Sequence, residues 1–451
     1  MIHFYRGMMN IKQITNTVRS LLMKDRKNEE KRVSFEKKPS AEPNVVVLWR
    51  FKKNKDYFAD GVVVLVQNGK GLLQEEYVNY YMGKSACTLM FGDKPLFQLQ
   101  GDEYFCPTCE KIVKSGYNLE QTDEFSFEAI NADGADFGTV VEQMKPLLGL
   151  LSDGVYCLWD TALYPTDGNG QLFWDYTNDN IPKDGSCIYY IGNCRYARML
   201  PLFTCATQPR RLYNAEQTEF YREKKGSRAI AYYCDGNMTA LLDGHHKAMA
   251  AALEHRQVSA VVISKCHVGR RYVDRKVVET ILYANDASFP VEELGVAEDM
   301  LDALCNRTLI KSTYYPISWT DEDVLPVDTK ELASYYPTVA ECACISQFDE
   351  INDELIDYYI DCAATGDKDE LMCLIRALGA LQNRRLFELV DTILHSSYDN
   401  DVLLCAVKQI AKQMERGDNM GVPDMQEYLI GCMVDIEEEH PIVGREILSL
   451  L

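Results

Sequence analysis

The pattern of apolar and polar positions divides the chain into regions with different periods. Residues 45–51 and 62–67 are runs rich in β-branched side chains, and the turn pair Asp60-Gly61 lies between them. Such runs are typical of two strands joined by a turn. Residues 137–151 have a helical period, and residues 154–160 have the continuous apolar pattern of a buried strand. We therefore expect the first part of the chain to be α+β.

Beyond residue 328 the pattern becomes helical, with short polar breaks. Asp367 followed by Glu370 predicts an N-cap and an acidic N3 position, and the apolar stripe that starts there recurs twice. The three stripes are Leu371, Leu374, Ile375, Leu378 and Leu381; Leu386, Leu389, Val390, Ile393 and Leu394; and Val402, Ala406, Val407 and Ile410. Helices of about 12 to 17 residues with short loops are similar to HEAT or related α-solenoid repeats. Such a layer is expected to support intramolecular packing or contacts with a protein partner.

Residues 208–265 combine several features of an anion site. The segment begins with Gln208-Pro209-Arg210-Arg211, where the proline ring favours an extended turn that presents two guanidinium groups. An apolar strand pattern at 239–242 then meets Asp243-Gly244, and an alanine-rich helix pattern follows. A strand, a glycine turn and a helix start bring unpaired backbone N–H groups and the positive end of a helix dipole to one point, which suits a phosphate. The apolar run at 260–264 is expected to complete a β-α-β unit.

This order of elements resembles the N-terminal nucleotide-binding domain of the partition protein ParB and its relatives, the ParB/sulfiredoxin-like fold. In that family a Gln-Pro-Arg box precedes a helix and two short strands, and a Gly-Glu-Arg-Arg box then opens an alanine-containing helix. The first box is matched by Gln208, Pro209, Arg210 and Arg211, and the second, in position but not in residue type, by Gly244, His245, His246 and Lys247. The resemblance implies that both boxes hold the phosphates of a nucleoside triphosphate, ATP or CTP.

The resemblance also implies roles for the charged residues of the two boxes. Arg210, Arg211 and Lys247 are expected to neutralise phosphates, and the backbone amides after Gly244 are expected to cradle them. Asp243 is a candidate ligand for a Mg²⁺ ion that accompanies the nucleotide.

Candidate catalytic groups are Asp243, His245 and His246, which would orient the nucleophile or the attacked group in an NTPase or phosphotransferase reaction. Sulfiredoxins carry a reactive cysteine where this chain has His245, so repair of cysteine sulfinic acid is not expected. His245 also replaces a catalytic acidic residue of other members. The alternative function is therefore a non-enzymatic interaction scaffold that retains the fold.

Histidines and basic residues concentrate around the second box. Adjacent His245 and His246 at a helix start project about 100° apart, so one is expected to face a ligand and the other to pack. His255 is expected to be a C-terminal cap or to contact solvent, and Cys266-His267 adds a thiol and an imidazole. The basic residues that follow indicate either an anion site or a solvated helix face; they are Lys265, Arg270, Arg271, Arg275 and Lys276.

Two other places have residue types that suit a metal ion. Cys106 and Cys109 have the spacing of a zinc knuckle, which is half of a structural site. A redox-active dithiol and two ordinary thiols are the alternatives for this pair. The cysteines considered as completing ligands are Cys87, Cys157, Cys187 and Cys194. The loop carboxylates Asp160, Asp167 and Asp175 can ligate Mg²⁺, although turns use aspartate more often for conformational reasons.

Composition and charge narrow the class of protein. A chain of 451 residues with 47% hydrophobic residues is expected to fold into several domains. The formal charge is −21, and residues 331–451 hold 24 acidic and 8 basic residues, which argues against a nucleic-acid partner. No apolar run reaches 18 residues and no signal-peptide pattern occurs, so neither a membrane span nor secretion is expected. Scattered through such a chain, the 16 cysteines fit a reducing cytoplasm.

Together these patterns predict a multidomain protein of the α/β and α+β classes. Residues 1–44 are expected to form a charged arm, which is either a solvated lead-in or a contact for nucleic acid or an acidic partner. An α+β region with the Cys-x-x-Cys knuckle is expected over residues 45–180, and a ParB-like nucleotide-binding domain with a β-α-β core over residues 181–325. The acidic helical, HEAT-like domain is expected over residues 326–451.

Overall fold

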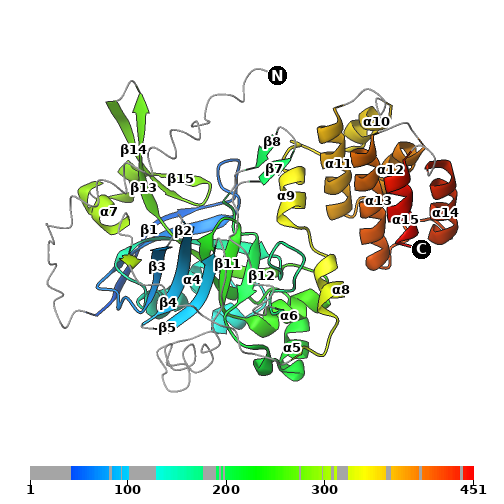
Figure 1. Cartoon of the computed structure of the whole chain (residues 1–451). Helices are drawn as coiled ribbons and strands as arrows, with labels where there is room; N and C mark the ends of the chain where they lie inside the picture. Colours follow the sequence, from blue (N-terminus) through cyan, green and yellow to red (C-terminus); the bar gives the residue numbers. More distant parts are fainter. Residues whose placement is uncertain are drawn as a thin grey trace. The chain divides into compact units, whose positions relative to one another are not determined.

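The computed structural model describes residues 42–80, 84–92, 94–100, 128–175, 189–191, 194–196, 199–273, 276–296, 298–305, 309–311, 324–361, 367–395, 399–436 and 440–451. These residues have a mixed α/β structure, in which a seven-stranded sheet is followed by a helical C-terminal part (Figure 1). This agrees with the expected combination of α/β and helical regions. Of the expected arm, residues 1–41 lie outside the described part of the chain.

The large sheet is mixed. Its strands, in spatial order, are β1 (Asn44–Phe51), β2 (Asp60–Gln67), β6 (Gly154–Leu163), β12 (Val258–Lys265), β10 (Ala229–Asp235), β11 (Met238–Asp243) and β9 (Phe203–Ala206). Two neighbouring pairs are parallel, β10 with β12 and β9 with β11, and the other pairs are antiparallel. Strands from both expected regions, residues 45–180 and residues 181–325, thus share one hydrogen-bonded sheet.

The elements expected in the first part of the chain are present. The runs at 45–51 and 62–67 are β1 and β2, which pair antiparallel as a turn between them requires. The apolar run at 154–160 is the start of β6. The helix expected over 137–151 is α4 (Phe137–Leu148), whose N-cap Asp136 accepts a hydrogen bond from the backbone N–H of Thr139.

The expected β-α-β unit is wrong in its pairing. The segments β11, α6 (His245–Leu253) and β12 follow each other as predicted, but β10 lies between β11 and β12 in the sheet. A tight turn from Asp235 to Met238 makes β11 return antiparallel to β10, whereas β12 runs parallel to β10. Strands β11 and β12 therefore run in opposite directions. Helix α6 connects β11 to β12, and β12 pairs in parallel with β10 and not with β11.

Both faces of the large sheet are covered by apolar side chains. Along β2, Val62, Val64 and Val66 belong to one cluster, and Val63 and Leu65 belong to the other, as the two-residue period of a strand requires. The first cluster contains the apolar face of α4, and the second contains the alanine-rich face of α6. Small side chains let α6 lie close to the strands, so its position is fixed by packing along most of its length.

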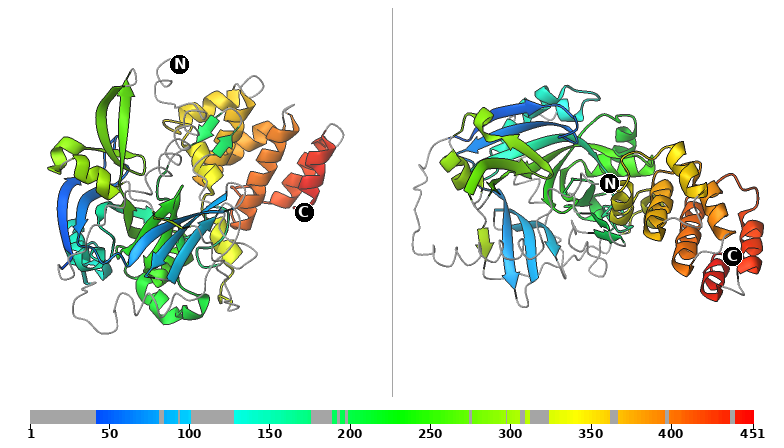
Figure 2. Two further views of the ribbon diagram at one scale, coloured as in Figure 1. Left: turned by 60° about the vertical axis from the view of Figure 1, so that its left-hand side comes forward. Right: turned by 90° about the horizontal axis from the view of Figure 1, so that it is seen from above.

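The remaining strands form smaller sheets (Figure 2). One sheet contains β16 (Leu309–Lys311), β3 (Leu73–Tyr80), β4 (Lys84–Phe91) and β5 (Lys94–Gln100). A second contains β13 (His267–Val273), β14 (Lys276–Ala284) and β15 (Ala287–Pro290), and a two-stranded sheet contains β7 (Tyr189–Ile191) and β8 (Cys194–Tyr196). Within the described residues, the short helices outside the C-terminal part are α3 (Glu128–Asn131), η2 (Arg210–Leu212), α5 (Ala215–Arg222), η3 (Val291–Leu294) and α7 (Glu298–Cys305).

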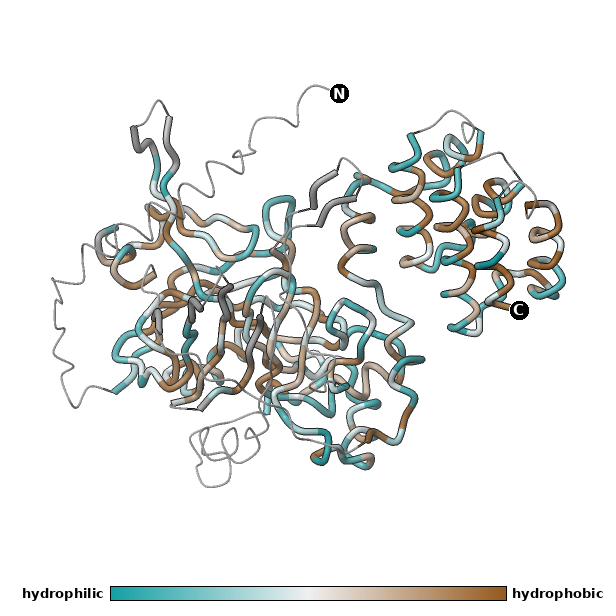
Figure 3. The backbone as a smooth tube through the Cα atoms, in the orientation of Figure 1, coloured by the Kyte–Doolittle hydropathy of each residue, from teal (hydrophilic) through white to brown (hydrophobic). Residues whose placement is uncertain are grey.

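The C-terminal helices form an array in which alternate helices contact each other. Two helices, α8 (Thr329–Ser334) and α9 (Val339–Ile345), precede α10 (Asp353–Asp361), α11 (Lys368–Ala380), α12 (Leu386–Leu394), α13 (Asn400–Glu415), α14 (Met425–Ile436) and α15 (Pro441–Leu448). Helix α9 packs on α11, α11 on α13 and α13 on α15, and α10 packs on α12. Apolar and polar stretches alternate along these helices (Figure 3). We call α9 to α15 the helical array.

The predicted stripes account for the core of the array. Asp367 caps α11 by accepting hydrogen bonds from the backbone N–H groups of Asp369 and Glu370, as the sequence predicts. The side chains of the three stripes are buried except for Leu381, which is 50% exposed because it is the C-cap of α11. None of the helices among the described residues is long and apolar enough to cross a membrane.

Candidate anion-binding site

The two sequence boxes meet because the strands that precede them are parallel neighbours. Strand β9 pairs with β11, with Ala206 opposite Leu241, so both strands end at the same edge of the sheet. The first box follows β9 and the second follows β11. Thr207, the residue directly after β9, donates its hydroxyl to the carbonyl of Leu241 at 2.6 Å and its backbone N–H to Nε2 of His245 at 3.1 Å. The carboxyl ends of parallel strands are where α/β sheets place ligands.

Gly244 makes the turn that starts α6. Its φ is 94°, in the left-handed region, and a Cβ at this position would lie 2.8 Å from the Cβ of Ala229 on β10. Only glycine meets both conditions without strain. As the N-cap, Gly244 provides no side-chain acceptor for the first turn of α6. The first amide groups of α6 are therefore left without a capping side chain.

His245 is buried and neutral. Its side chain is 2% exposed, and burial, with a smaller effect of His246, lowers its pKa to about 3. Because Nε2 accepts a hydrogen bond from Thr207, the ring proton of the neutral form lies on Nδ1. Among the described residues Nδ1 has no hydrogen-bond partner. The ring lies against Trp174, with 5.5 Å between centroids. The first helical residue of α6 thus contains a buried N–H donor that lacks an acceptor.

His246 ties α6 to the start of α5. Its Nε2 lies 3.0 Å from the backbone N of Asn214 and 3.1 Å from the carbonyl of Leu212, so the tautomer decides which of the two it bonds. Burial lowers its pKa. The expectation that one histidine packs is met by His245, and His246 also contacts protein atoms, packing edge-on against Trp174 at 5.7 Å.

Lys247 lies inside the protein. Its side chain is 3% exposed, and its Nζ donates to the carbonyl of Arg228 at 2.6 Å. The carboxylate of Asp243 is 3.8 Å from Nζ, and the ring of Tyr221 is 5.4 Å away. Burial lowers the pKa of Lys247, whereas Asp243 opposes this shift. The ammonium group is therefore held by internal acceptors at the base of the second box.

The first box contributes one buried and one exposed cation. Arg210 begins the short helix η2 and is buried, and its Nη1 lies 3.3 Å from Oδ1 of Asp175. Arg211 is exposed. The carbonyl of Gln208 accepts a hydrogen bond from Nε1 of Trp174 at 2.7 Å. Trp174 thus touches both boxes, since its ring also packs against the two histidines.

The loop carboxylates each have a partner within the protein. Asp160 forms a bidentate pair with Arg228, and Asp175 lies beside Arg210. Asp167 accepts backbone N–H groups of its own loop, and burial raises its pKa. No group of three or more His, Cys, Asp or Glu side chains that could hold a metal ion occurs within the described residues.

The cysteine pair proposed for zinc, Cys106 and Cys109, lies outside the residues that the structure describes, as does Cys187. Of the completing cysteines, Cys87 and Cys157 are buried in the protein. Burial raises the pKa of the Cys157 thiol, and the nearby Cys266 thiol adds to the shift. Cys157 is therefore expected to stay a protonated core thiol.

The basic stretch after β12 starts at the far end of the sheet from Gly244. Since β12 runs antiparallel to β11, Lys265 lies at the opposite edge, about 16 Å along the strand from Ala260 at a rise of about 3.3 Å per residue. The stretch then enters β13 and β14 and not the helix face considered above, and Arg270 forms an ion pair with Asp302. Burial lowers the pKa of His267 to about 4. Arg275 lies outside the residues that the structure describes. Strands β13 and β14, which hold Arg270, Arg271 and Lys276, follow β12 at the end of the sheet opposite to Gly244.

Sequence reasoning missed four residues that shape this site: Thr207, Asn214, Trp174 and Arg228. Thr207 and Asn214 anchor the histidines through backbone N–H groups, which no side-chain pattern reveals. Trp174 could have been found from the sequence, because a tryptophan in a polar loop is expected to be buried with a hydrogen-bond partner for its indole N–H.

His255 lies at the other end of α6, just past its C-cap. It has a φ of 51° and stacks on Tyr335, as a left-handed residue after a helix end does. The C-cap of α6 is Glu254, so the expectation of a cap is wrong for His255, whereas its exposed side chain agrees with the expected solvent contact.

Comparison with known proteins gives no relative. No family model matches the chain, and no curated protein or solved structure is similar enough to match. The function therefore has to be argued from the geometry of the two boxes.

Proposed function

We propose that the chain binds a phosphate-bearing ligand, a nucleoside triphosphate such as ATP or CTP, on a ParB-like core. The observation that carries the proposal is the meeting of the two boxes at the carboxyl ends of β9 and β11, with His245 bonded to Thr207 across the join. The start of α6 offers uncapped amides there. A phosphate is the ligand chemistry that such a helix start and nearby guanidinium groups recognise.

The donors at the boxes fit an anion better than a cation. Nδ1 of His245 is a neutral N–H donor in need of an acceptor, and Arg210 and Arg211 contribute guanidinium groups. Arg210 already lies beside Asp175, and Lys247 already donates to Arg228. An incoming phosphate therefore has to compete with internal acceptors, which favours a ligand with several phosphate groups over a single weak anion.

A Mg²⁺ ion is proposed only as a companion of the nucleotide. Asp243 is the carboxylate directly before the second box, and its side chain is 44% exposed. Mg²⁺ commonly binds one or two carboxylates together with the phosphates of its substrate, and it supplies charge neutralisation there. One partly exposed carboxylate fits that arrangement.

Turnover is a separate part of the proposal. His245 is too weak a base at neutral pH, since its pKa is about 3 and its Nε2 is engaged by Thr207. Any NTPase or phosphotransferase reaction would depend on Asp243 or His246 in a ligand-bound arrangement. Binding without turnover is the simpler function that these contacts support.

The test is direct binding of ATP, CTP, GTP and UTP by isothermal titration and thermal shift, with and without Mg²⁺. A ligand at 100 times its Kd should stabilise the protein by about 2.7 kcal/mol. The variant Arg210→Ala, Arg211→Ala should lose this shift, and the matched control Lys368→Ala, an exposed cation in the array, should keep it. Absence of a shift with all four nucleotides at millimolar concentration would remove the proposal.

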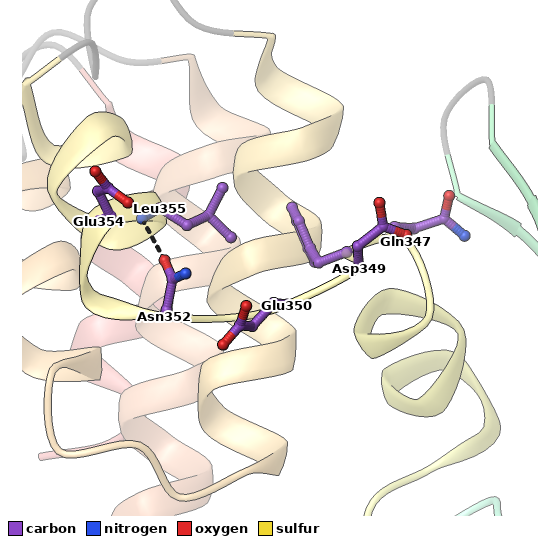
Figure 4. Close-up of a pocket in the computed structure, with 7 residues that line it drawn as sticks. Gln347, Asp349, Glu350, Asn352, Glu354 and Leu355 are labelled. Carbon is purple, nitrogen blue, oxygen red and sulfur yellow. Dashed lines mark hydrogen bonds between the residues drawn. The ribbon is translucent and has the colours of Figure 1, made fainter. Parts of the chain in front are cut away.

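A second candidate, a non-enzymatic interaction scaffold, is favoured by one observation in the array. The loop between α9 and α10 forms an open hollow of about 500 Å³, and Phe348 is among the residues that line it. Leu355 and the carboxylates of Asp349, Glu350 and Glu354 also line it (Figure 4). Apolar side chains among carboxylates suit a basic peptide by charge complementarity. The remaining lining residues are Gln347 and Asn352.

This second candidate has its own test. A fluorescent peptide of alternating lysine and leucine should bind the protein and lose affinity in the variant Asp349→Asn, Glu350→Gln, Glu354→Gln. A control that neutralises Glu388 and Glu415 elsewhere on the array should not weaken binding. Equal losses in both variants would indicate general attraction to an acidic protein and no site.

A further inference from the structure

Thr329, the first residue of helix α8, is linked to Arg210 through the carboxylate of Asp175. The hydroxyl of Thr329 donates to Oδ2 of Asp175 at 2.7 Å, and Oδ1 of the same carboxylate lies 3.3 Å from Nη1 of Arg210. Asp175 is thus held between α8 and the first box. A shift of α8 would change how firmly Asp175 is fixed beside Arg210.

The other end of α8 holds the end of α6. The hydroxyl of Tyr336, just past α8, donates to the carbonyls of Ala251 at 3.3 Å and Arg256 at 3.0 Å. The ring of Tyr335 stacks on His255, with 3.4 Å between centroids and 10° between planes. Helix α6 starts at the second box, so α8 and the two residues after it contact the helix of the second box directly and are linked to the first box through Asp175.

The helical array holds α8 from the opposite side. Arg416, at the C-cap of α13, is 7% exposed and donates Nε to the carbonyl of Ser334 at 2.6 Å and Nη1 to the carbonyl of Gly379 at 3.0 Å. The hydroxyl of Tyr335 donates back to the carbonyl of Arg416 at 3.1 Å. The last residues of α8 are therefore fixed to both α11 and α13.

We propose that the helical array regulates the anion site through α8, because the contacts of Arg416 with α8 keep Asp175 in place as an internal competitor for Arg210. The inference rests on the proposed function. A ligand phosphate at Arg210 has to displace the Asp175 carboxylate, which Thr329 fixes. Whatever weakens the hold of the array on α8 then favours the ligand, and by linkage the ligand loosens α8 from the array. A protein that binds the array near α13 would change ligand affinity from a distance.

The experiment measures inorganic tripolyphosphate binding by isothermal titration to the full chain and its variants. Thr329→Val removes only the hydroxyl that fixes Asp175, and Asp175→Asn removes the competing charge. Both are expected to bind tripolyphosphate at least threefold more tightly. Arg416→Gln acts from the array and should increase affinity in the same direction. The matched control is Lys408→Gln, an exposed cation on α13.

The outcomes separate this inference from the proposed function. If the unaltered protein binds tripolyphosphate and the Thr329 and Arg416 variants bind equally well, the regulation is refuted and the anion site stands. If the unaltered protein does not bind it, or any of the nucleotides, both proposals are refuted together. Since Arg416→Gln can disturb folding, Arg416→Lys serves as a second variant, and weaker binding in both of them would also overturn the proposed direction.

A second measurement follows the proposed loosening of α8 from the helical array. Adding tripolyphosphate should speed hydrogen exchange of the amides in α8 while protecting those of η2, where Leu212 and Tyr213 donate to the carbonyls of Pro209 and Arg210. A purely structural role of α8 predicts protection of both segments on ligand binding. Protection of α8 would therefore contradict the competition.

Discussion

Replacing Gly244 with alanine tests whether the start of α6 is as constrained as the geometry indicates. Two costs add at this position. A left-handed backbone costs a non-glycine residue about 1–2 kcal/mol. A new Cβ would also lie 2.8 Å from the Cβ and 2.9 Å from the Cα of Ala229, and overpacking of this kind costs about 1–3 kcal/mol. We expect Gly244→Ala to destabilise the protein by about 2–4 kcal/mol, after a small gain from the less flexible unfolded chain.

Gly170 provides a matched control. Its φ is 93°, almost the same as the 94° of Gly244, but a Cβ there would meet no atom within 4 Å. Gly170→Ala should therefore cost only the backbone part, about 1–2 kcal/mol. The difference between the two variants measures the contact with Ala229. Adding Ala229→Gly to Gly244→Ala should recover part of that difference, as coupled neighbours do in a double-mutant cycle.

The assay is urea unfolding of each variant, combined with hydrogen exchange of the α6 amides by mass spectrometry. Exchange reads the local stability of α6 even if the sheet and the array unfold separately. In Gly244→Ala the first turn of α6 should exchange faster, and tripolyphosphate affinity should fall because the amides are displaced. Equal costs for the Gly170 and Gly244 variants would refute the argument that the β10 strand forces glycine at this turn.

Three further changes test other contacts. His245→Gln should flatten the pH dependence of stability between about pH 6.5 and pH 3: the folded pKa lies below the unfolded value, so stability is lost as pH falls through this window, by up to about 1.4 kcal/mol per pH unit. Urea midpoints at pH 7, 6 and 5 for the variant and the unaltered protein measure this, and parallel curves would contradict the burial of the imidazole. Lys412→Met should lower the free energy of unfolding by about 3–5 kcal/mol, because it leaves the buried Glu341 carboxylate, which lies 2.6 Å from Nζ of Lys412, without its ion-pair partner. The exposed Lys408→Met is the control. Equal losses of stability for both variants in calorimetry would show that the ion pair is unimportant. Trp174→Phe keeps the ring packing but loses the bond to Gln208, so thermal unfolding should report a loss of about 1 kcal/mol, and no loss would mean that water replaces the carbonyl.

Local patterns were sufficient for the helices and strands that the sequence analysis named, which are a minority of the elements in the structure. The N-cap at Asp367 and the apolar stripe after it depend only on neighbouring residues, and both are present in α11. Gly244 likewise marks a turn, since its positive φ is a local backbone conformation that glycine adopts readily. The pairing of strands is different, because β11 and β12 are adjacent in sequence but separated by β10 in the sheet. The hairpin turn at Gly236-Asn237 sets that order, because it pairs β10 with β11. The prediction of a β-α-β unit did not include this turn.

The sequence predicted that the two boxes lie together, but it did not predict which residues they contact. Arg210, Gly244, His245 and Lys247 do lie around one edge of the sheet, which follows from parallel strands that end together. Their partners come from distant segments: Asp175 for Arg210 and Arg228 for Lys247. Such partners are chosen by burial, since a buried cation needs an acceptor from whichever segment packs against it. Sequence spacing contains no information on that choice.

These internal partners fit the proposal of a local anion site in an acidic protein. Each buried cation of the two boxes already has an oxygen acceptor within the fold, so the boxes are locally close to neutral within a chain whose net charge is −21. In the proposed site, a phosphate of the ligand replaces the Asp175 carboxylate beside Arg210. The affinity for the ligand is then the small difference between two large interaction energies, one for each acceptor. A single hydroxyl, that of Thr329, can shift such a balance, and Thr329 belongs to a helix whose other end is bonded to the array. Under the two proposals, the internal pairing that a ligand has to displace at Arg210 also makes ligand affinity sensitive to the state of the helical array.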